Sequence, residues 1–86
     1  MSDVVGLGTL AMDVLVQVDR LPGVDGFAVV TGRSYLPGGS GTNVITQAAR
    51  LGARAAYIGK VGDDQLGTQI LESLRSEGVD TAGMRV

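Results

Sequence analysis

The chain has 86 residues, of which 44% are hydrophobic and 19% charged, a composition typical of folded rather than disordered protein. A chain of this length makes at most one domain, because short chains bury a smaller fraction of their surface. It contains no cysteine and no histidine. Disulfides, thiolate or imidazole metal sites, and catalytic arrangements built on Cys or Ser-His are therefore excluded.

Charge and aromatic content exclude a nucleic-acid partner. Seven basic and nine acidic residues give a net charge of −2 with no basic block, and only Phe27, Tyr35 and Tyr57 are aromatic. Nucleic-acid binders need positive surfaces and stacking platforms. No apolar run approaches the roughly 20 residues of a membrane helix, and the first residues lack a cationic segment. We therefore expect a cytoplasmic protein without membrane contact.

The first half of the chain is dominated by strand patterns. Residues 3–10 predict a short buried strand, whose glycines allow close packing against the backbone. Residues 13–19 alternate apolar and polar side chains, which is strand period rather than helix period. A turn around residues 22–26 leads into a second β-prone run over residues 27–36. These two runs predict an antiparallel pair.

The second half alternates helices and strands. The glycine-rich run 37–41 opens a helix over residues 42–51, which stops at Gly52. The remaining predicted elements are a strand over 55–61, a helix that follows Gly62-Asp63-Asp64 and ends at Gly78, and a strand beginning at 84–86.

This order predicts an α/β fold with a parallel central sheet flanked by helices. The antiparallel pair does not fit that alternation, so we expect residues 13–37, approximately, to project from the sheet as a lid. The half-strand at residues 84–86 needs partners that the chain does not contain. Residues 1–86 therefore predict one incomplete domain.

Two common nucleotide-binding motifs do not fit this sequence. Residues 6–11 match the dinucleotide pattern G-x-G-x-x-G/A. That motif needs a helix to begin within its glycines, so that the pyrophosphate meets the helix N-terminus, whereas residues 13–19 have strand period. A Walker A loop is excluded because no glycine is followed by Lys and then Ser or Thr.

The residues 37–43 form the better candidate site. Glycines bring backbone N–H groups close to a ligand where a helix begins, and the carboxamide of Asn43 both donates and accepts, as a sugar hydroxyl does. The alternative is an ordinary glycine-rich turn in which Asn43 caps the helix.

Asp13, at the carboxyl end of a strand, is placed to accept hydrogen bonds from two hydroxyls of a polyol. Its alternative is a turn aspartate that satisfies nearby backbone.

Three other charged residues have simpler explanations. Asp63 and Asp64 precede a helix, so we interpret them as capping and first-turn residues rather than catalysts. Lys60, the only lysine, is interpreted as a solvated residue at a strand end.

Four motifs in the second half of the chain are specific in their combined spacing. They are Gly38-Gly39-Ser40-Gly41-Thr42-Asn43, Ala48-Ala49-Arg50-Leu51-Gly52-Ala53, Tyr57-Ile58-Gly59-Lys60-Val61-Gly62-Asp63-Asp64 and Leu66-Gly67. Through them the chain strongly resembles the N-terminal portion of the PfkB or ribokinase-like carbohydrate kinases. Residues 6–13 resemble the first strand of that family with its sugar-binding aspartate, and residues 14–36 resemble its β-lid.

The resemblance implies ATP-dependent phosphorylation of a sugar or of a related alcohol such as a nucleoside. It implies that Asp13, Gly39, Ser40 and Asn43 contact the acceptor, and that the lid closes over it and mediates a homodimer. Ser40 stands where ribokinases often have lysine, and Ala11 where they often have a sugar-contacting asparagine, which puts ribose itself in doubt. ATP and Mg²⁺ are implied as cofactors, with their binding residues outside this chain.

The family's second signature, a Gly-Ala-Gly-Asp stretch with the catalytic base, does not occur in the chain. We therefore expect the 86 residues alone to be inactive. Two alternatives stay open: a nucleoside or sugar-phosphate kinase of the same fold, and a non-catalytic module that binds a sugar or pairs through its lid strands.

Overall fold

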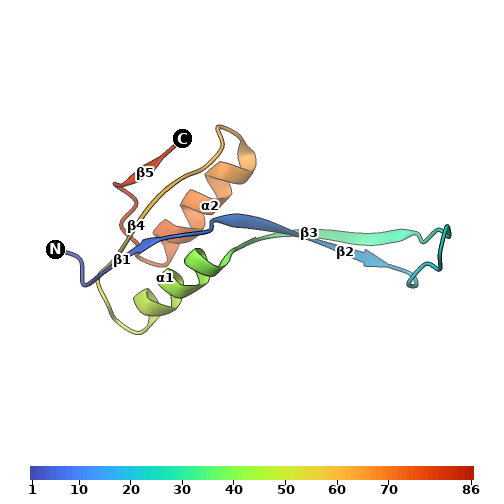
Figure 1. Ribbon diagram of the computed structural model, residues 1–86, viewed down its shortest axis with the longest axis horizontal. Coiled ribbons are helices and arrows are strands. Elements are labelled where there is room, and N and C mark those ends of the chain that lie inside the picture. The colour runs from blue at the N-terminus through green and yellow to red at the C-terminus, as the bar shows by residue number, and fades with distance from the viewer.

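The computed structural model describes all 86 residues, which form an α/β part and a long two-stranded lid (Figure 1). The α/β part has a parallel sheet in the order β1-β4-β5, and the lid is the antiparallel pair β2-β3. The predicted α/β fold with a projecting antiparallel pair is thereby confirmed. The elements are β1 (Val4–Leu7), β2 (Ala11–Val18), β3 (Val30–Gly38), α1 (Ser40–Arg50), β4 (Ala55–Lys60), α2 (Gln65–Ser76) and β5 (Met84–Arg85).

The apolar core lies on one face of the parallel sheet. The central strand β4 sends Tyr57 to this face, where it is buried with Ile45 of α1 and Leu74 of α2. The next residue, Ile58, points to the opposite face and is 49% exposed. Because side chains alternate along a strand, both helices cover the same face of the sheet and leave the other open.

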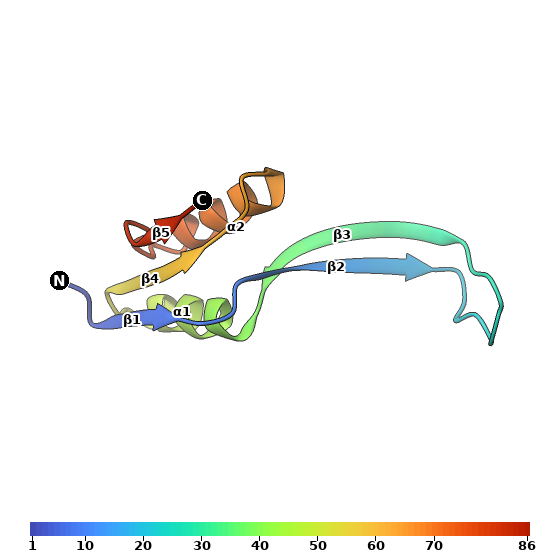
Figure 2. The same ribbon diagram turned by 45° about the horizontal axis from the view of Figure 1, so that its top comes forward.

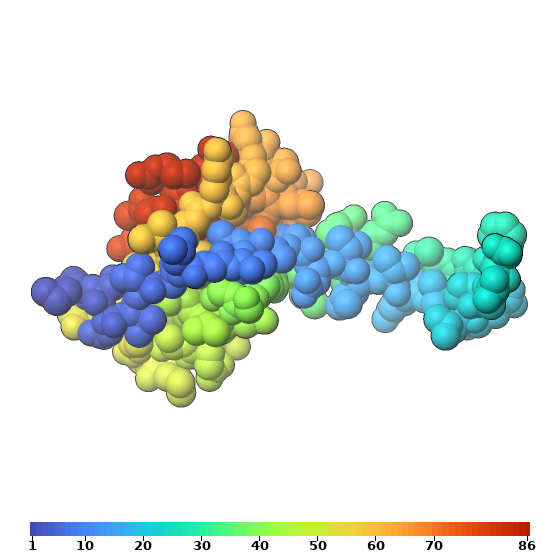
Figure 3. Space-filling view, in the orientation of Figure 1, coloured from blue at the N-terminus to red at the C-terminus, as the bar shows by residue number.

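The lid leaves the α/β part as a narrow arm (Figures 2 and 3). It accounts for the elongated shape of the chain, whose principal extents are 53 × 28 × 20 Å. Its tip is closed by two hydrogen bonds: the N–H of Asp19 donates to the carbonyl of Val29 (3.0 Å), and the N–H of Val29 donates to the Asp19 carboxylate (3.1 Å). Phe27, at the tip, is largely exposed.

Two predictions about the strands are corrected by the structure. The second lid strand begins at Val30 rather than at residue 27, because residues 27–29 belong to the tip that the Asp19 contacts close. The predicted buried strand at residues 3–10 is shorter, Val4–Leu7, and largely exposed, with Leu7 at 80%. It pairs only with β4 and is covered on one face only, so an apolar run does not ensure burial.

A bidentate ion pair joins the C-terminal ends of the two helices. The Arg50 guanidinium donates to both carboxylate oxygens of Glu77, at 2.8 and 2.5 Å. The side-chain hydrogen bond from Arg50 holds the pKa of Glu77 below its ordinary value, and the charge of Arg50 adds to that effect. A lowered carboxyl pKa stabilises the fold above the ordinary value and loses that contribution as the pH falls through the folded-state value.

We therefore expect Glu77→Gln to flatten the acid side of the stability profile. Below a pH of about 4.3 the melting temperature of the parent protein should fall more steeply than that of the variant. The matched control is Glu72→Gln on the same helix, because Glu72 forms no ion pair. Equal acid slopes for the parent and Glu77→Gln would show that the ion pair contributes nothing measurable.

Candidate functional site

The candidate site lies where the end of β1 meets the start of α1. The N–H of Thr42 donates to the carbonyl of Thr9 (3.3 Å), which ties the first turn of the helix to the segment that follows β1. Gly39 is the N-cap of α1 and has a φ of 96°. A Cβ at Gly39 would lie 2.6 Å from the Thr9 oxygen, so both the backbone conformation and the close approach require glycine.

Asp13 lies near the base of the lid, on the strand β2. Its carboxylate covers the Cα of Gly38, since a Cβ built there would lie 2.5 Å from the nearer carboxylate oxygen. Asp13 is exposed, and its side chain makes no hydrogen bond or ion pair within the chain. The structure therefore does not support the alternative of a turn aspartate that satisfies backbone groups, and the carboxylate is free to accept hydrogen bonds from a ligand.

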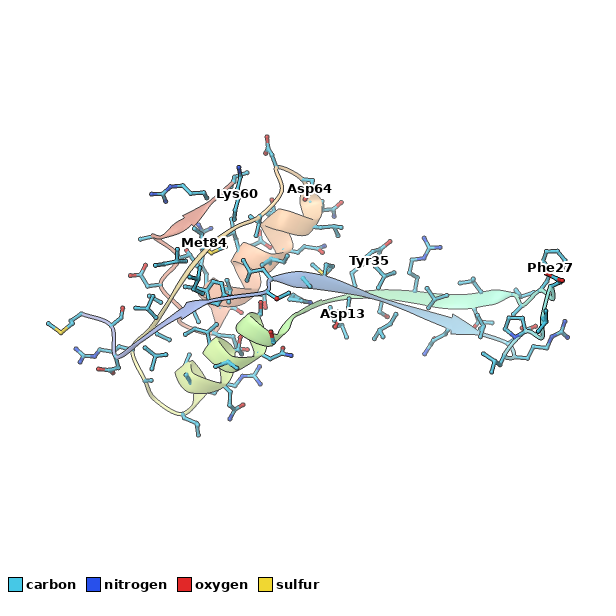
Figure 4. The ribbon with its side chains drawn as sticks, viewed as in Figure 1. Asp13, Phe27, Tyr35, Lys60, Asp64 and Met84 are labelled. Atoms are coloured by element: carbon cyan, nitrogen blue, oxygen red, sulfur yellow. The ribbon has the colours of Figure 1, made fainter.

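The two faces of the lid carry different chemistry near its base (Figure 4). Asp13 pairs across the strands with Leu36, and Val14 pairs with Tyr35. Because cross-strand partners share a face and neighbours alternate, Asp13 and Tyr35 lie on opposite faces. The carboxylate and the neighbouring tyrosine therefore cannot face the same ligand.

Ser40 and Asn43 both lie in the first turn of α1 but face different spaces. Asn43 lines a cavity of about 290 Å³ between the two helices. Ser40 lines a separate cavity of about 330 Å³ along β1. Asn43 does not cap the helix, because the N-cap is Gly39 and no side chain bonds to the free amides of the first turn. The structure thus brings Asp13 against the glycine segment, while Ser40 and Asn43, neighbours in the first turn of α1, line two different cavities.

The structure adds Tyr57 to the residues around this site. Its position in β4 indicates only a core residue, but its hydroxyl lies beside Gly8 and Gly41, the end of β1 and the first turn of α1. The oxygen is buried and has no hydrogen-bond partner. The one sequence signal that was available is a tyrosine at a core position of a strand otherwise lined by apolar residues.

A family profile decides the relationship of this chain to known proteins. The profile of the pfkB family carbohydrate kinases matches residues 1–86, the whole chain. The chain belongs to the pfkB family. The resemblance predicted from the glycine motifs is confirmed.

Individual pfkB-family members are similar over nearly the whole chain. It is 41% identical over 81 residues to a ribokinase of Bacillus subtilis strain 168, covering 94% of this chain and 28% of that protein. It is 41% identical over 86 residues to an ATP-dependent ribose-1-phosphate kinase of Halopiger xanaduensis, covering 100% of this chain and 29% of that protein. The chain spans less than a third of the length of these relatives.

A solved structure of the family has the same fold. Arabidopsis thaliana ribokinase complexed with ribose and ATP superposes with a TM-score of 0.84 at 28% sequence identity, over 98% of this chain and 28% of that chain. The ribokinase-like fold predicted for this chain is therefore confirmed, including the lid, which lies within the matched part.

The remaining charged candidates have structural roles or none. The Asp64 carboxylate caps α2 by accepting a hydrogen bond from the N–H of Gly67 (2.8 Å), which confirms its interpretation as a cap. The same interpretation is wrong for Asp63, because α2 begins at Gln65 with Asp64 as its cap, and Asp63 lies before the cap with no side-chain hydrogen bond. Lys60 is exposed at the end of β4 and forms no ion pair. Figure 4 shows Lys60 and Asp64 on the α/β part.

The chain has neither a cluster of carboxylates nor a helix long enough to cross a membrane. No group of three or more carboxylates lies together. The two helices, of 11 and 12 residues, are too short to span a bilayer.

Proposed function

We propose that this chain is the N-terminal, acceptor-binding part of a kinase that transfers the terminal phosphoryl group of ATP to a hydroxyl of a sugar. The observation that carries the proposal is the exposed, unpaired carboxylate of Asp13 lying against Gly38, next to the glycine N-cap of α1. Membership in a family of carbohydrate kinases supports the same conclusion.

The chemistry of the site suits a polyhydroxylated acceptor. A carboxylate that no other group uses can accept two hydroxyl hydrogen bonds, which would fix the orientation of the sugar. The amides at the start of α1 have no helical partner and lie at the positive end of the helix. We assign Gly39 to backbone contact with the acceptor, and Ser40 and Asn43 to contact with its hydroxyls. Orientation of this kind is the main contribution that a protein makes to phosphoryl transfer.

The phosphate-handling half of the reaction is assigned to residues outside this chain. A catalytic base must lie within hydrogen-bond reach of the attacking hydroxyl. Asp64 is occupied as a helix cap, and Asp13 is assigned to binding, so no aspartate here is given the role of base. ATP and Mg²⁺ would also be held by residues outside this chain.

The activity is tested with the full-length protein and with the 86-residue chain. We expect the full-length protein to consume ATP with at least one member of a panel of pentoses, hexoses, sugar phosphates and nucleosides. The isolated chain should show no consumption above background with any of them. Sugar binding by the full-length protein without ATP consumption would instead favour a non-catalytic binding module. Turnover by the isolated chain would refute the assignment of the catalytic base and the nucleotide site to residues outside it.

The lid is also proposed to pair with the lid of a second copy. Val14, Val16 and Tyr35 share one face of the lid and are each about half exposed, and Arg33, the cross-strand partner of Val16, lies on the same face. An isolated two-stranded pair is only marginally stable in water, and contact with a second apolar face would protect it. The proposed partner is therefore a second copy of this protein, joined through the valine face.

This pairing predicts different effects for substitutions on the two faces of the lid. Val16→Lys should convert the full-length dimer to a monomer in sedimentation velocity runs, because it places a lysine opposite Arg33 and so two like charges where the lids would meet. Gln17→Lys changes the neighbouring residue on the opposite face and should leave the dimer intact. A monomeric parent protein, or a dimer unaffected by Val16→Lys, would rule out pairing through the valine face.

A further inference from the structure

The hydroxyl of Tyr57 occupies a position that the packing of the core does not explain. Tyr57 has no exposed surface, and its ring is seated against β1 at Gly6. A Cβ built on Gly6 would lie 2.6 and 2.7 Å from two ring carbons, so the ring fills space that only a glycine leaves open. A phenylalanine ring would fill that space equally well. The question is therefore what the oxygen does.

The oxygen lies against two backbone segments of the candidate site. A Cβ built on Gly41 would collide with the phenol oxygen, and one built on Gly8 would lie 3.5 Å from both that oxygen and the Cα of Gly41. Gly41 lies in the first turn of α1, and Gly8 follows the last residue of β1. Three groups that are far apart in the sequence thus meet at one point, where the phenol oxygen contacts both backbones and the two backbones also contact each other.

The oxygen has at most one weak polar interaction within the chain. It is buried, no group meets it with good hydrogen-bond geometry, and its polar neighbour is the backbone of Gly8. Burial raises the pKa of the Tyr57 phenol above its ordinary value, and the Gly8 backbone opposes that rise. A buried hydroxyl without a partner lowers stability, so its presence points to a role other than stability.

We propose that the Tyr57 hydroxyl is a positioning group of the acceptor site, a spacer that sets the separation between the end of β1 and the first turn of α1. This inference rests on the proposed kinase function. Gly41 is preceded directly by Gly39 and Ser40, and the adjoining Thr42 N–H is bonded to the Thr9 carbonyl. A change in the spacing at Gly41 therefore moves the residues that are assigned to the acceptor.

Steady-state kinetics of the full-length protein test this role. Tyr57→Phe should raise the KM for the acceptor about threefold to tenfold, because a small displacement of positioning groups weakens binding and alignment. The KM for ATP should stay unchanged, and the melting temperature should not fall, since an unpaired buried hydroxyl is removed. The control, Ser76→Ala, removes a hydroxyl at the C-terminal end of α2 that bonds to the carbonyl of Ser73, and it should change neither KM.

A double-mutant cycle tests the contact itself. Gly41→Ala should raise the acceptor KM by more than about tenfold, because its methyl group collides with the phenol oxygen. Tyr57→Phe in the same chain removes that oxygen and should recover part of the loss. Recovery should be incomplete, because the methyl would still lie 3.0 Å from the Gly8 carbonyl carbon.

The outcomes separate this inference from the proposed function. An unchanged acceptor KM in Tyr57→Phe, or the same loss from Gly41→Ala with and without the hydroxyl, would overturn the spacer role while the kinase function stands. Absence of any sugar kinase activity would refute the proposed function instead. In that case the double-mutant cycle is measured by thermal unfolding of the same variants. Strictly additive shifts in melting temperature would overturn the contact between Gly41 and the hydroxyl, and partial rescue of Gly41→Ala by Tyr57→Phe would support it.

Discussion

Replacing Asp13 with alanine in the full-length protein is expected to weaken acceptor binding by about 1–3 kcal/mol, roughly a fivefold to 150-fold rise in Kd. The reason is that the carboxylate makes no bond within the chain, so its hydrogen-bonding capacity is available to the acceptor. Isothermal titration calorimetry with the best substrate of the panel measures the effect. Asn43→Ala is expected to act in the same direction and by a similar amount.

Stability measurements separate this effect from damage to the fold. Because Asp13 bonds to nothing in the chain, Asp13→Ala should change the free energy of unfolding by less than about 0.5 kcal/mol. The matched control for charge is Asp63→Ala, which removes an aspartate that makes no side-chain hydrogen bond and should leave acceptor affinity unchanged. If Asp13→Ala and Asn43→Ala both leave acceptor affinity unchanged, the site assignment is wrong.

A second large effect is expected at Gly67, in the first turn of α2. A Cβ there would overlap the carbonyl oxygen of Gly62 and lie 3.0 Å from its carbon, and backbone atoms cannot move aside as a flexible side chain does. Gly67 also donates the hydrogen bond that Asp64 accepts as N-cap. Gly67→Ala should therefore lower the free energy of unfolding by about 1–3 kcal/mol or more, despite the better helix propensity of alanine.

Chemical denaturation of the parent and variant measures this loss. The matched control is Gly23→Ala at the tip of the lid, where an added Cβ meets no atom within 4 Å. That substitution should change stability by no more than about 0.5 kcal/mol, or raise it slightly through the unfolded state. Equal stability of Gly67→Ala and the parent would mean that the turn between Gly62 and Gly67 relaxes freely.

Local patterns predicted most of the fold. The alternation over residues 13–19 predicted a strand where the dinucleotide motif needs a helix, and β2 confirms it. The cap at Asp64 and the stops at Gly52 and Gly78 were also predictable, and both of these glycines have positive φ. Such features depend on residues within a few positions of one another, so sequence spacing contains the required information.

Boundaries were less predictable where distant segments compete. The predicted loop over residues 37–41 is reduced to Gly39. The strand β3 continues through Pro37 and Gly38 in register with Met12 and Ala11, and α1 begins at Ser40 rather than at residue 42. Strand pairing across the lid, and not the local break expected from Pro and Gly, decides where the strand ends.

The sequence by itself determined the order of elements, the family, and the residue types available for chemistry, because these follow from composition, period and motif spacing. With no histidine or cysteine in the chain, carboxylates, hydroxyls, amides, basic side chains and backbone groups were left for a site. The candidate site, in which the exposed carboxylate of Asp13 lies against Gly38, uses groups of this kind.

Only the tertiary structure decided which of these residues meet. It set Asp13 against Gly38, and it directed Ser40 and Asn43 into different cavities although they are three positions apart. It also placed the hydroxyl of Tyr57 between the end of β1 and the start of α1. These distances depend on how the strands and helices pack across long separations in the chain, and no local pattern carries that information.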